Sequence, residues 1–140
     1  MVVYLAVAEV IEIHAQAMEA MGWAVAPLRS VHLLESAVMK AQMAAYYGSA
    51  DLAEQAAALA IGISQNQPFL DGNKRTAYVS LVTFLQLNGY SVIARNLEIA
   101  DQLVAVAERE GTLEEATTAF AGWLRERLTE TPPPASAAKS

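Results

Sequence analysis

The sequence contains no cysteine, so the chain can form no disulfide and has no thiolate for catalysis or metal binding. It has only two histidines and lacks the pattern His-Glu-x-x-His, which argues against a zinc site. The Walker phosphate-binding pattern is absent too, because it would need a glycine at Gln67 and a lysine at Asn73. Basic residues are scarce: nine Lys and Arg stand against fifteen Asp and Glu, a formal charge of -6. Since cations supply most of the affinity for nucleic acid, we expect no nucleic-acid partner.

Long apolar runs and a basic leader are also missing. No apolar stretch approaches the ~20 residues of a membrane span, and the first residues lack the basic region of a secretion signal. We therefore expect no membrane partner and a cytoplasmic protein. The length of 140 residues, 54% of them apolar, indicates one domain, predicted to span residues 4–128. Residues 129–140 contain three consecutive prolines followed by Ala and Ser, and are predicted to be a disordered tail.

Helical periodicity dominates what remains. Apolar residues at three- and four-residue spacings predict helices at about 4–21, 31–46, 52–64, 76–87, 96–107 and from 113 onward. The predicted N-caps are Ser30, Asp51, Asn96 and Thr112. Gly22 and Asn88-Gly89 are predicted helix ends. No strand pattern is found in the sequence. The predicted fold class is therefore all-α, a compact single-domain helical bundle around a buried central helix, 76–87.

The segment 66–75, Asn-Gln-Pro-Phe-Leu-Asp-Gly-Asn-Lys-Arg, leads into that central helix. A helix N-terminus has free backbone N–H groups and the positive end of the helix dipole, which together bind anions. Lys74 and Arg75 oppose this dipole by roughly 0.3–1 kcal/mol each. Unless Asp71 balances both cations, a negative ligand such as phosphate is therefore expected at this point.

The residue types in this segment suit such a ligand. Gly72 lets it approach the backbone, Asn73 offers an amide, and Arg75 offers a planar fork for two oxygens. Asp71 is a possible ligand for Mg²⁺, which takes one or two carboxylates besides phosphate oxygens and water. A purely structural interpretation stays open here, with Asp71 as N-cap, Gly72 in the turn, Phe69 buried as a staple and two solvated cations. The almost entirely apolar helix that follows favours a site, because a helix buried all round is a rigid platform.

The segment resembles the core motif of the Fic/Doc family, His-x-Phe-x-Asp/Asn-Gly/Ala-Asn-Lys/Gly-Arg. Lys74, in place of a second glycine, is similar to the Doc (death-on-curing) branch. Similarity extends through residues 9–14, 28–37 and 87–90, so it covers most of the first 128 residues. The resemblance implies the Fic fold and, as co-substrate, ATP or another nucleotide triphosphate. It also implies Mg²⁺ held by Asp71 and a set of residues that bind the phosphate oxygens: Gly72, Asn73, Lys74 and Arg75.

The resemblance further implies a toxin of a toxin–antitoxin pair, which transfers phosphate to a Ser or Thr of a translation factor and so arrests growth. Its partners would be an antitoxin protein and that target. Catalytic positions would be Gln67, Asp71 and Arg75. AMP-transferring members usually have a second arginine where this chain has Tyr78, which favours phosphate transfer over AMP transfer. The alternatives are a Fic-type AMP-transferase and a non-catalytic module that binds a nucleotide, a target or an antitoxin.

Gln67 departs from the family, because it stands where relatives have the catalytic histidine. A carboxamide accepts no proton near neutral pH, so this form is expected to be inactive or weak. Two explanations stay open: a degenerate or altered member, or deliberate inactivation.

Three other residues each have two interpretations. His14 is either a partnered core residue or a neighbour of the cleft. Trp23 is either a core aromatic or part of a flap. The resemblance implies this flap within residues 22–30, as a possible short hairpin that in relatives docks the target. Glu35 is either a solvated helix acid or, by the resemblance, a residue that orients motif side chains.

Overall fold

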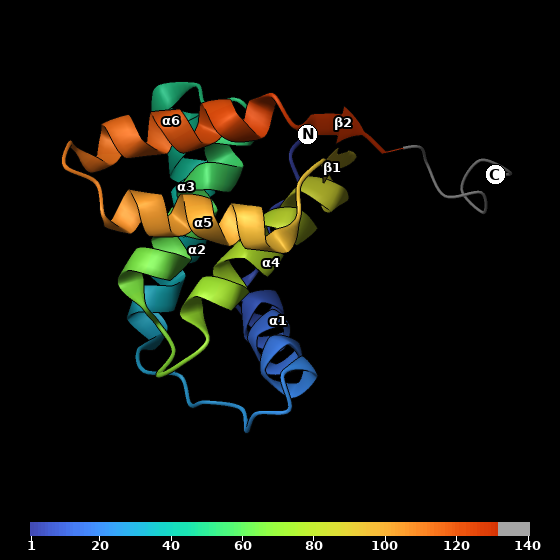
Figure 1. Cartoon of the computed structure of the whole chain (residues 1–140), viewed down its shortest axis with the longest axis vertical. Coiled ribbons are helices and arrows are strands. Elements are labelled where there is room, and N and C mark those ends of the chain that lie inside the picture. Colours follow the sequence, from blue (N-terminus) through green and yellow to red (C-terminus); the bar gives the residue numbers. More distant parts are fainter. Residues whose placement is uncertain (132–140) are drawn as a thin grey trace, which may run out of the picture.

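A computed structural model describes residues 1–131 of the chain, and it folds them into six helices and one small sheet (Figure 1). The elements are, in order, α1 (Val7–Ala20), α2 (Val31–Gly48), α3 (Leu52–Asn66), α4 (Asn73–Leu87), β1 (Tyr90–Val92), α5 (Asn96–Ala107), α6 (Leu113–Arg125) and β2 (Leu128–Glu130). In Figure 1, α5 and α6 lie together at one end of the molecule and α1 lies at the other. The predicted all-α class is confirmed.

Helices α3 and α4 pack together at the centre. Small residues let α3 lie close to its neighbours: a Cβ added at Gly62 would be 3.2 Å from Ala37 Cα in α2. On α4, Leu81, Phe84 and Leu85 are fully buried. The predicted buried helix at 76–87 is therefore confirmed, and its motif end begins earlier, at Asn73. Because α4 is fixed along most of its length, its first turn has a defined position.

Several helices have a side-chain hydrogen bond that caps their N-terminus. Three predicted N-caps are confirmed, each with a side-chain oxygen that accepts a hydrogen bond from the backbone N–H three residues later: Ser30, Asp51 and Thr112. The prediction for Asn96 is wrong, because Arg95 occupies the N-cap of α5. Arg95 donates its backbone N–H to the Glu98 carboxylate at 2.9 Å. This bond stabilises the first turn of α5, whose N-cap lies one residue earlier than predicted.

The chain before α1 is extended, and the helix begins at Val7 rather than at Tyr4. Ala6 donates its backbone N–H to Glu9 Oε1 (2.9 Å), and this bond fixes the start of the helix. Tyr4 lies against the core instead and donates its hydroxyl to Gln55 Oε1 at 2.8 Å.

Two short strands were not predicted. Gly89, with φ +86°, turns the chain from α4 into β1. β1 pairs antiparallel with β2, with Ser91 opposite Thr129. Strands of three residues are too short to show alternation in the sequence. The tail predicted from residue 129 therefore begins inside β2, and the rest of that tail, 132–140, lies outside the described residues.

The hairpin predicted within 22–30 does not form. Leu28 instead makes an isolated antiparallel bridge with Phe69, far along the chain. Two backbone hydrogen bonds flank the bridge: Arg29 N–H to Pro68 O at 2.6 Å and Leu70 N–H to Pro27 O at 3.0 Å. The connection between α1 and α2 is thus attached to the loop between α3 and α4.

Candidate functional site

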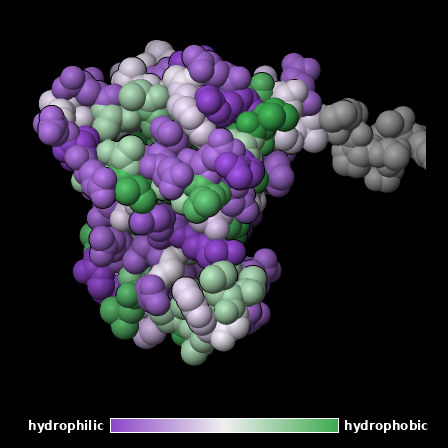
Figure 2. Space-filling model, viewed as in Figure 1, coloured by the Kyte–Doolittle hydropathy of each residue, from purple (hydrophilic) through white to green (hydrophobic). Residues whose placement is uncertain are grey.

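A cleft of about 880 Å³ opens at the N-terminal end of α4. Its walls are the connection after α1, the end of α3, the first turns of α4, one face of α5, and residues 67–72, which we call the motif loop. Hydrophilic and hydrophobic side chains are mixed over the face of the molecule shown in Figure 2. The six candidate site residues all line this cleft: Gln67, Asp71, Gly72, Asn73, Lys74 and Arg75.

The first turn of α4 has unused hydrogen-bond donors. The backbone N–H groups of Asn73, Lys74 and Arg75 have no acceptor within residues 1–131, and Thr76 is the first residue of the turn whose N–H is bonded, to Gly72 O at 3.0 Å. Three free N–H groups at the positive end of a helix dipole can bind an anion.

Two cations stand at the same place without a counter-ion. Neither Lys74 nor Arg75 forms an ion pair with a carboxylate in the described part of the chain. Asp71 instead accepts the Gly72 N–H at 2.8 Å. The Arg75 guanidinium lies 5.8 Å from the ring centre of Tyr78, on the cleft wall. The structural interpretation is wrong about the N-cap, which is Gly72, with φ +82°, and not Asp71. It is right that Phe69 is buried.

The Asn73 side chain is used inside the motif loop. Its Oδ1 accepts the Phe69 N–H (2.9 Å), and its Nδ2 donates to Phe69 O (2.8 Å). Phe69 is 2% exposed, so these bonds satisfy backbone groups that water does not reach. The side-chain amide of Asn73, which was predicted to bind phosphate, is therefore engaged within the loop. The backbone N–H of Asn73 is the group left for a ligand.

Asp71 is an exposed carboxylate at the cleft. No group of three or more His, Asp or Glu that could hold a metal is found among the described residues. A single carboxylate can hold Mg²⁺ only where other ligands, such as phosphate oxygens and water, fill the remaining positions of the ion.

Gln67 is exposed in the cleft, where it ends α3 in the left-handed conformation (φ 49°). Arg29 holds this turn from the connection before α2: its Nε donates to Gln67 O and its Nη2 to Asn66 O, each at 2.8 Å. The Gln67 side chain makes no hydrogen bond to any residue in 1–131, so it is free to meet a ligand.

His14 is a partnered core residue, and its partners are in the motif loop. Its ring is 1% exposed, stacks on Phe69 and lies 2.8 Å, at Nε2, from Asp71 O. Glu35 is a solvated helix acid that pairs with His32 at 3.4 Å, and it forms no hydrogen bond or ion pair with the motif among the described residues.

The sequence-based prediction missed the wall formed by α5. Leu97 is 68% exposed there, and faces the cleft together with Trp23 (52%) and Leu70 (62%). Trp23 is therefore a residue of the cleft rather than of the core. The position of Leu97 on the cleft could not be predicted from the sequence, because it depends on how α5 packs against the other helices.

Comparison with known proteins gives two findings. Residues 4–85 match the sequence model of the Fic/DOC family, a stretch that contains α1, α2, α3 and the motif loop. A curated relative, Toxin Doc of Mycolicibacterium smegmatis (strain ATCC 700084 / mc(2)155), is 35% identical over 100 residues, which cover 69% of this chain and 77% of the relative. Separately, no helix among residues 1–131 is long and apolar enough to cross a membrane.

Proposed function

Because the chain belongs to the Fic/DOC family, we propose that it is a Doc-like toxin whose reaction transfers the terminal phosphate of a nucleotide triphosphate to a Ser or Thr of a translation factor. Modification of that factor would arrest growth. The observation that carries the proposal is the first turn of α4. There, N–H groups and two cations that have no partner within residues 1–131 face the cleft.

Each part of the cleft suits one part of a nucleotide. The N–H groups of residues 73–75, the Lys74 ammonium and the Arg75 fork would hold phosphate oxygens. Asp71 would hold Mg²⁺, which when bound neutralises charge that develops on the phosphate. The apolar side chains of Trp23, Leu70 and Leu97 offer a surface for the nucleobase.

In the reaction the acceptor hydroxyl oxygen forms a bond to the terminal phosphorus. The bond between that phosphorus and the bridging oxygen breaks, and the nucleoside diphosphate leaves with this oxygen. The hydroxyl proton must pass to a base. A base in position is worth about 10²–10⁴-fold in rate, and the Gln67 amide cannot act as one. We therefore propose that this form binds the nucleotide and transfers phosphate slowly.

The free N–H groups and the cations at the start of α4 also support a second candidate function, a non-catalytic binding module. Asp71 is the only carboxylate, and no histidine is present, among the described residues that line the cleft. AMP transfer has less support, because Tyr78 stands where AMP-transferring members usually have a second arginine. We also propose an antitoxin protein as partner, since a relative is a toxin and a growth-arresting enzyme must be restrained in the cell that makes it.

Calorimetry with Mg-ATP tests the site. We expect Arg75→Ala to bind at least tenfold more weakly than the parent, because a hydrogen bond to a charged group contributes about 1.5–3 kcal/mol. Lys40→Ala removes an exposed cation from α2, away from the cleft, and should bind as the parent does. Equal affinity of the parent and Arg75→Ala would show that the assigned site is wrong.

A further inference from the structure

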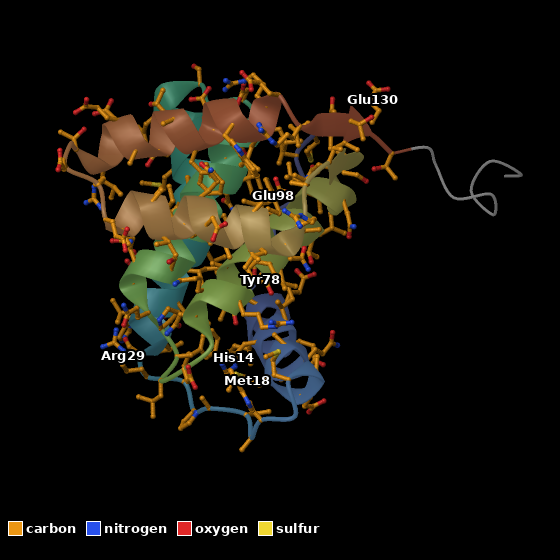
Figure 3. All side chains as sticks on the ribbon, in the orientation of Figure 1. His14, Met18, Arg29, Tyr78, Glu98 and Glu130 are labelled. Carbon is orange, nitrogen blue, oxygen red and sulfur yellow. The ribbon has the colours of Figure 1, made fainter. Side chains whose placement is uncertain are left out.

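We propose that His14 is a positioning residue for the motif loop, and that it aligns the Asp71–Gly72 peptide for ligand binding. The proposal rests on the function proposed above. Figure 3 shows His14 and Met18 on α1, next to the start of α4, which carries Tyr78. His14 does not line the cleft, so it lies behind the loop and is not a substitute for the missing base.

His14 contacts the loop at two points. Its Nε2 lies 2.8 Å from Asp71 O, and because a carbonyl oxygen only accepts, Nε2 carries the hydrogen and donates. Its ring is parallel to that of Phe69, with 3.7 Å between ring centres and 5° between planes. The His14 ring is 1% exposed, so the stack on Phe69 and the hydrogen bond from Nε2 together fix its orientation.

The hydrogen bond from His14 reaches the ligand-binding groups through one rigid unit. The Asp71 carbonyl and the Gly72 N–H belong to the same planar peptide. That N–H donates to Asp71 Oδ1 at 2.8 Å, so the orientation of this peptide also places the carboxylate assigned to Mg²⁺. The peptide then leads directly into the free N–H groups of α4.

Close packing leaves this peptide little room on the side of α1. A Cβ added at Gly72 would be 2.6 Å from Met18 Sδ and 3.3 Å from His14 Nε2. Other residues hold other parts of the loop: Arg29 holds Gln67 O and Asn73 holds Phe69. In the described chain, His14 is the side chain that holds the Asp71 carbonyl.

Loss of the donor should therefore let the Asp71–Gly72 peptide rotate, and a ligand would have to order it on binding. His14→Gln and His14→Met test this as a matched pair, because the two side chains have similar shape and only glutamine carries an N–H near the position of Nε2. By calorimetry, Mg-ATP should bind His14→Gln within about threefold of the parent and His14→Met about 3- to 10-fold more weakly, the range expected for one hydrogen bond. His14→Phe keeps a ring on Phe69 without the donor, and should bind as weakly as His14→Met.

Urea denaturation of each variant separates affinity from folding. A purely structural histidine would give His14→Gln and His14→Met the same affinity once both are folded, and that result would overturn the proposal. If His14→Met does not fold, His14→Phe replaces it in the comparison with His14→Gln. Failure of the parent itself to bind Mg-ATP would instead overturn the proposed function, so the two failures are distinguishable.

Discussion

At the residue scale, Gln67 decides which steps the cleft can support. Its left-handed backbone costs a non-glycine residue about 1 kcal/mol or more. Arg29 holds this backbone, and so does the hydrogen bond from the Gln67 N–H to Ile63 O (3.2 Å). The sequence shows that a base is missing at this position. It does not show that the side chain is free in the cleft, because that depends on Arg29, from a segment remote in sequence.

Gly72 is the loop residue whose replacement should cost most stability. Gly72→Ala places a Cβ at φ +82° and 2.6 Å from Met18 Sδ, and should lower the free energy of unfolding by about 1–3 kcal/mol. Gly122→Ala is the matched control within α6. It meets nothing within 4 Å and should be neutral or stabilising by up to about 1 kcal/mol. Urea denaturation measures both, and equal stability of the two variants would contradict the packing of Gly72 against α1.

At the scale of elements, the helices were predictable and the short strands were not. Caps and periodicity are local signals, so Ser30, Asp51 and Thr112 identified helix starts from the sequence. The pairing of β1 with β2 joins segments far apart in the chain and left no local trace. The strand-like contact of Leu28 with Phe69 also joins segments far apart in the chain, so no local pattern marks it. The hairpin predicted there came from the family resemblance.

The contact between α3 and α6 should make stability depend on pH. Arg125 Nε donates to Asp51 Oδ2 at 2.7 Å, and this hydrogen bond is the main reason that the pKa of Asp51 is lowered from 3.8. A lowered pKa in the folded state adds stability above the unfolded pKa, which is lost as pH falls through the folded value. Asp51→Asn keeps the cap but not the charge, so it should be less stable than the parent at pH 7 by about 1 kcal/mol or less, since the pair is half-exposed.

Denaturation of both proteins from pH 7 down to about pH 2 checks this prediction. The difference should shrink as Asp51 is protonated, and also with added salt. A difference that stays constant over the whole range would show that the charge of Asp51 contributes nothing.

At the scale of the whole molecule, the cleft combines parts of the chain that the sequence keeps separate. The motif loop and the start of α4 are contiguous, so their position at a helix N-terminus could be predicted from residue types. The α5 wall with Leu97 and the contacts of His14 and Arg29 arise from packing between helices, and no local pattern marks them. The sequence therefore predicted which residues gather at the start of α4, and it missed the contacts that support them and the far wall of the cleft.

Restoring the base tests the central claim, that this chain is a phosphotransferase lacking only its histidine. Gln67→His should stop colony formation on induction, because every other motif element is in place and the acceptor hydroxyl would again have a base. Gln67→Ala should remain tolerated. Gln67→His with Asp71→Ala should be tolerated again, since charge on the phosphate would not be neutralised. Coexpression of a small protein encoded beside this gene, as the antitoxin, should restore growth.

The decisive measurement is transfer of label from ATP to a lysate protein by Gln67→His. The account predicts transfer from γ-labelled ATP, none from α-labelled ATP, and at least a hundredfold less with the parent chain, within the range of about 10²–10⁴-fold for a positioned base. Transfer from α-labelled ATP would mean AMP transfer. No transfer from either label would contradict the account and leave the binding module.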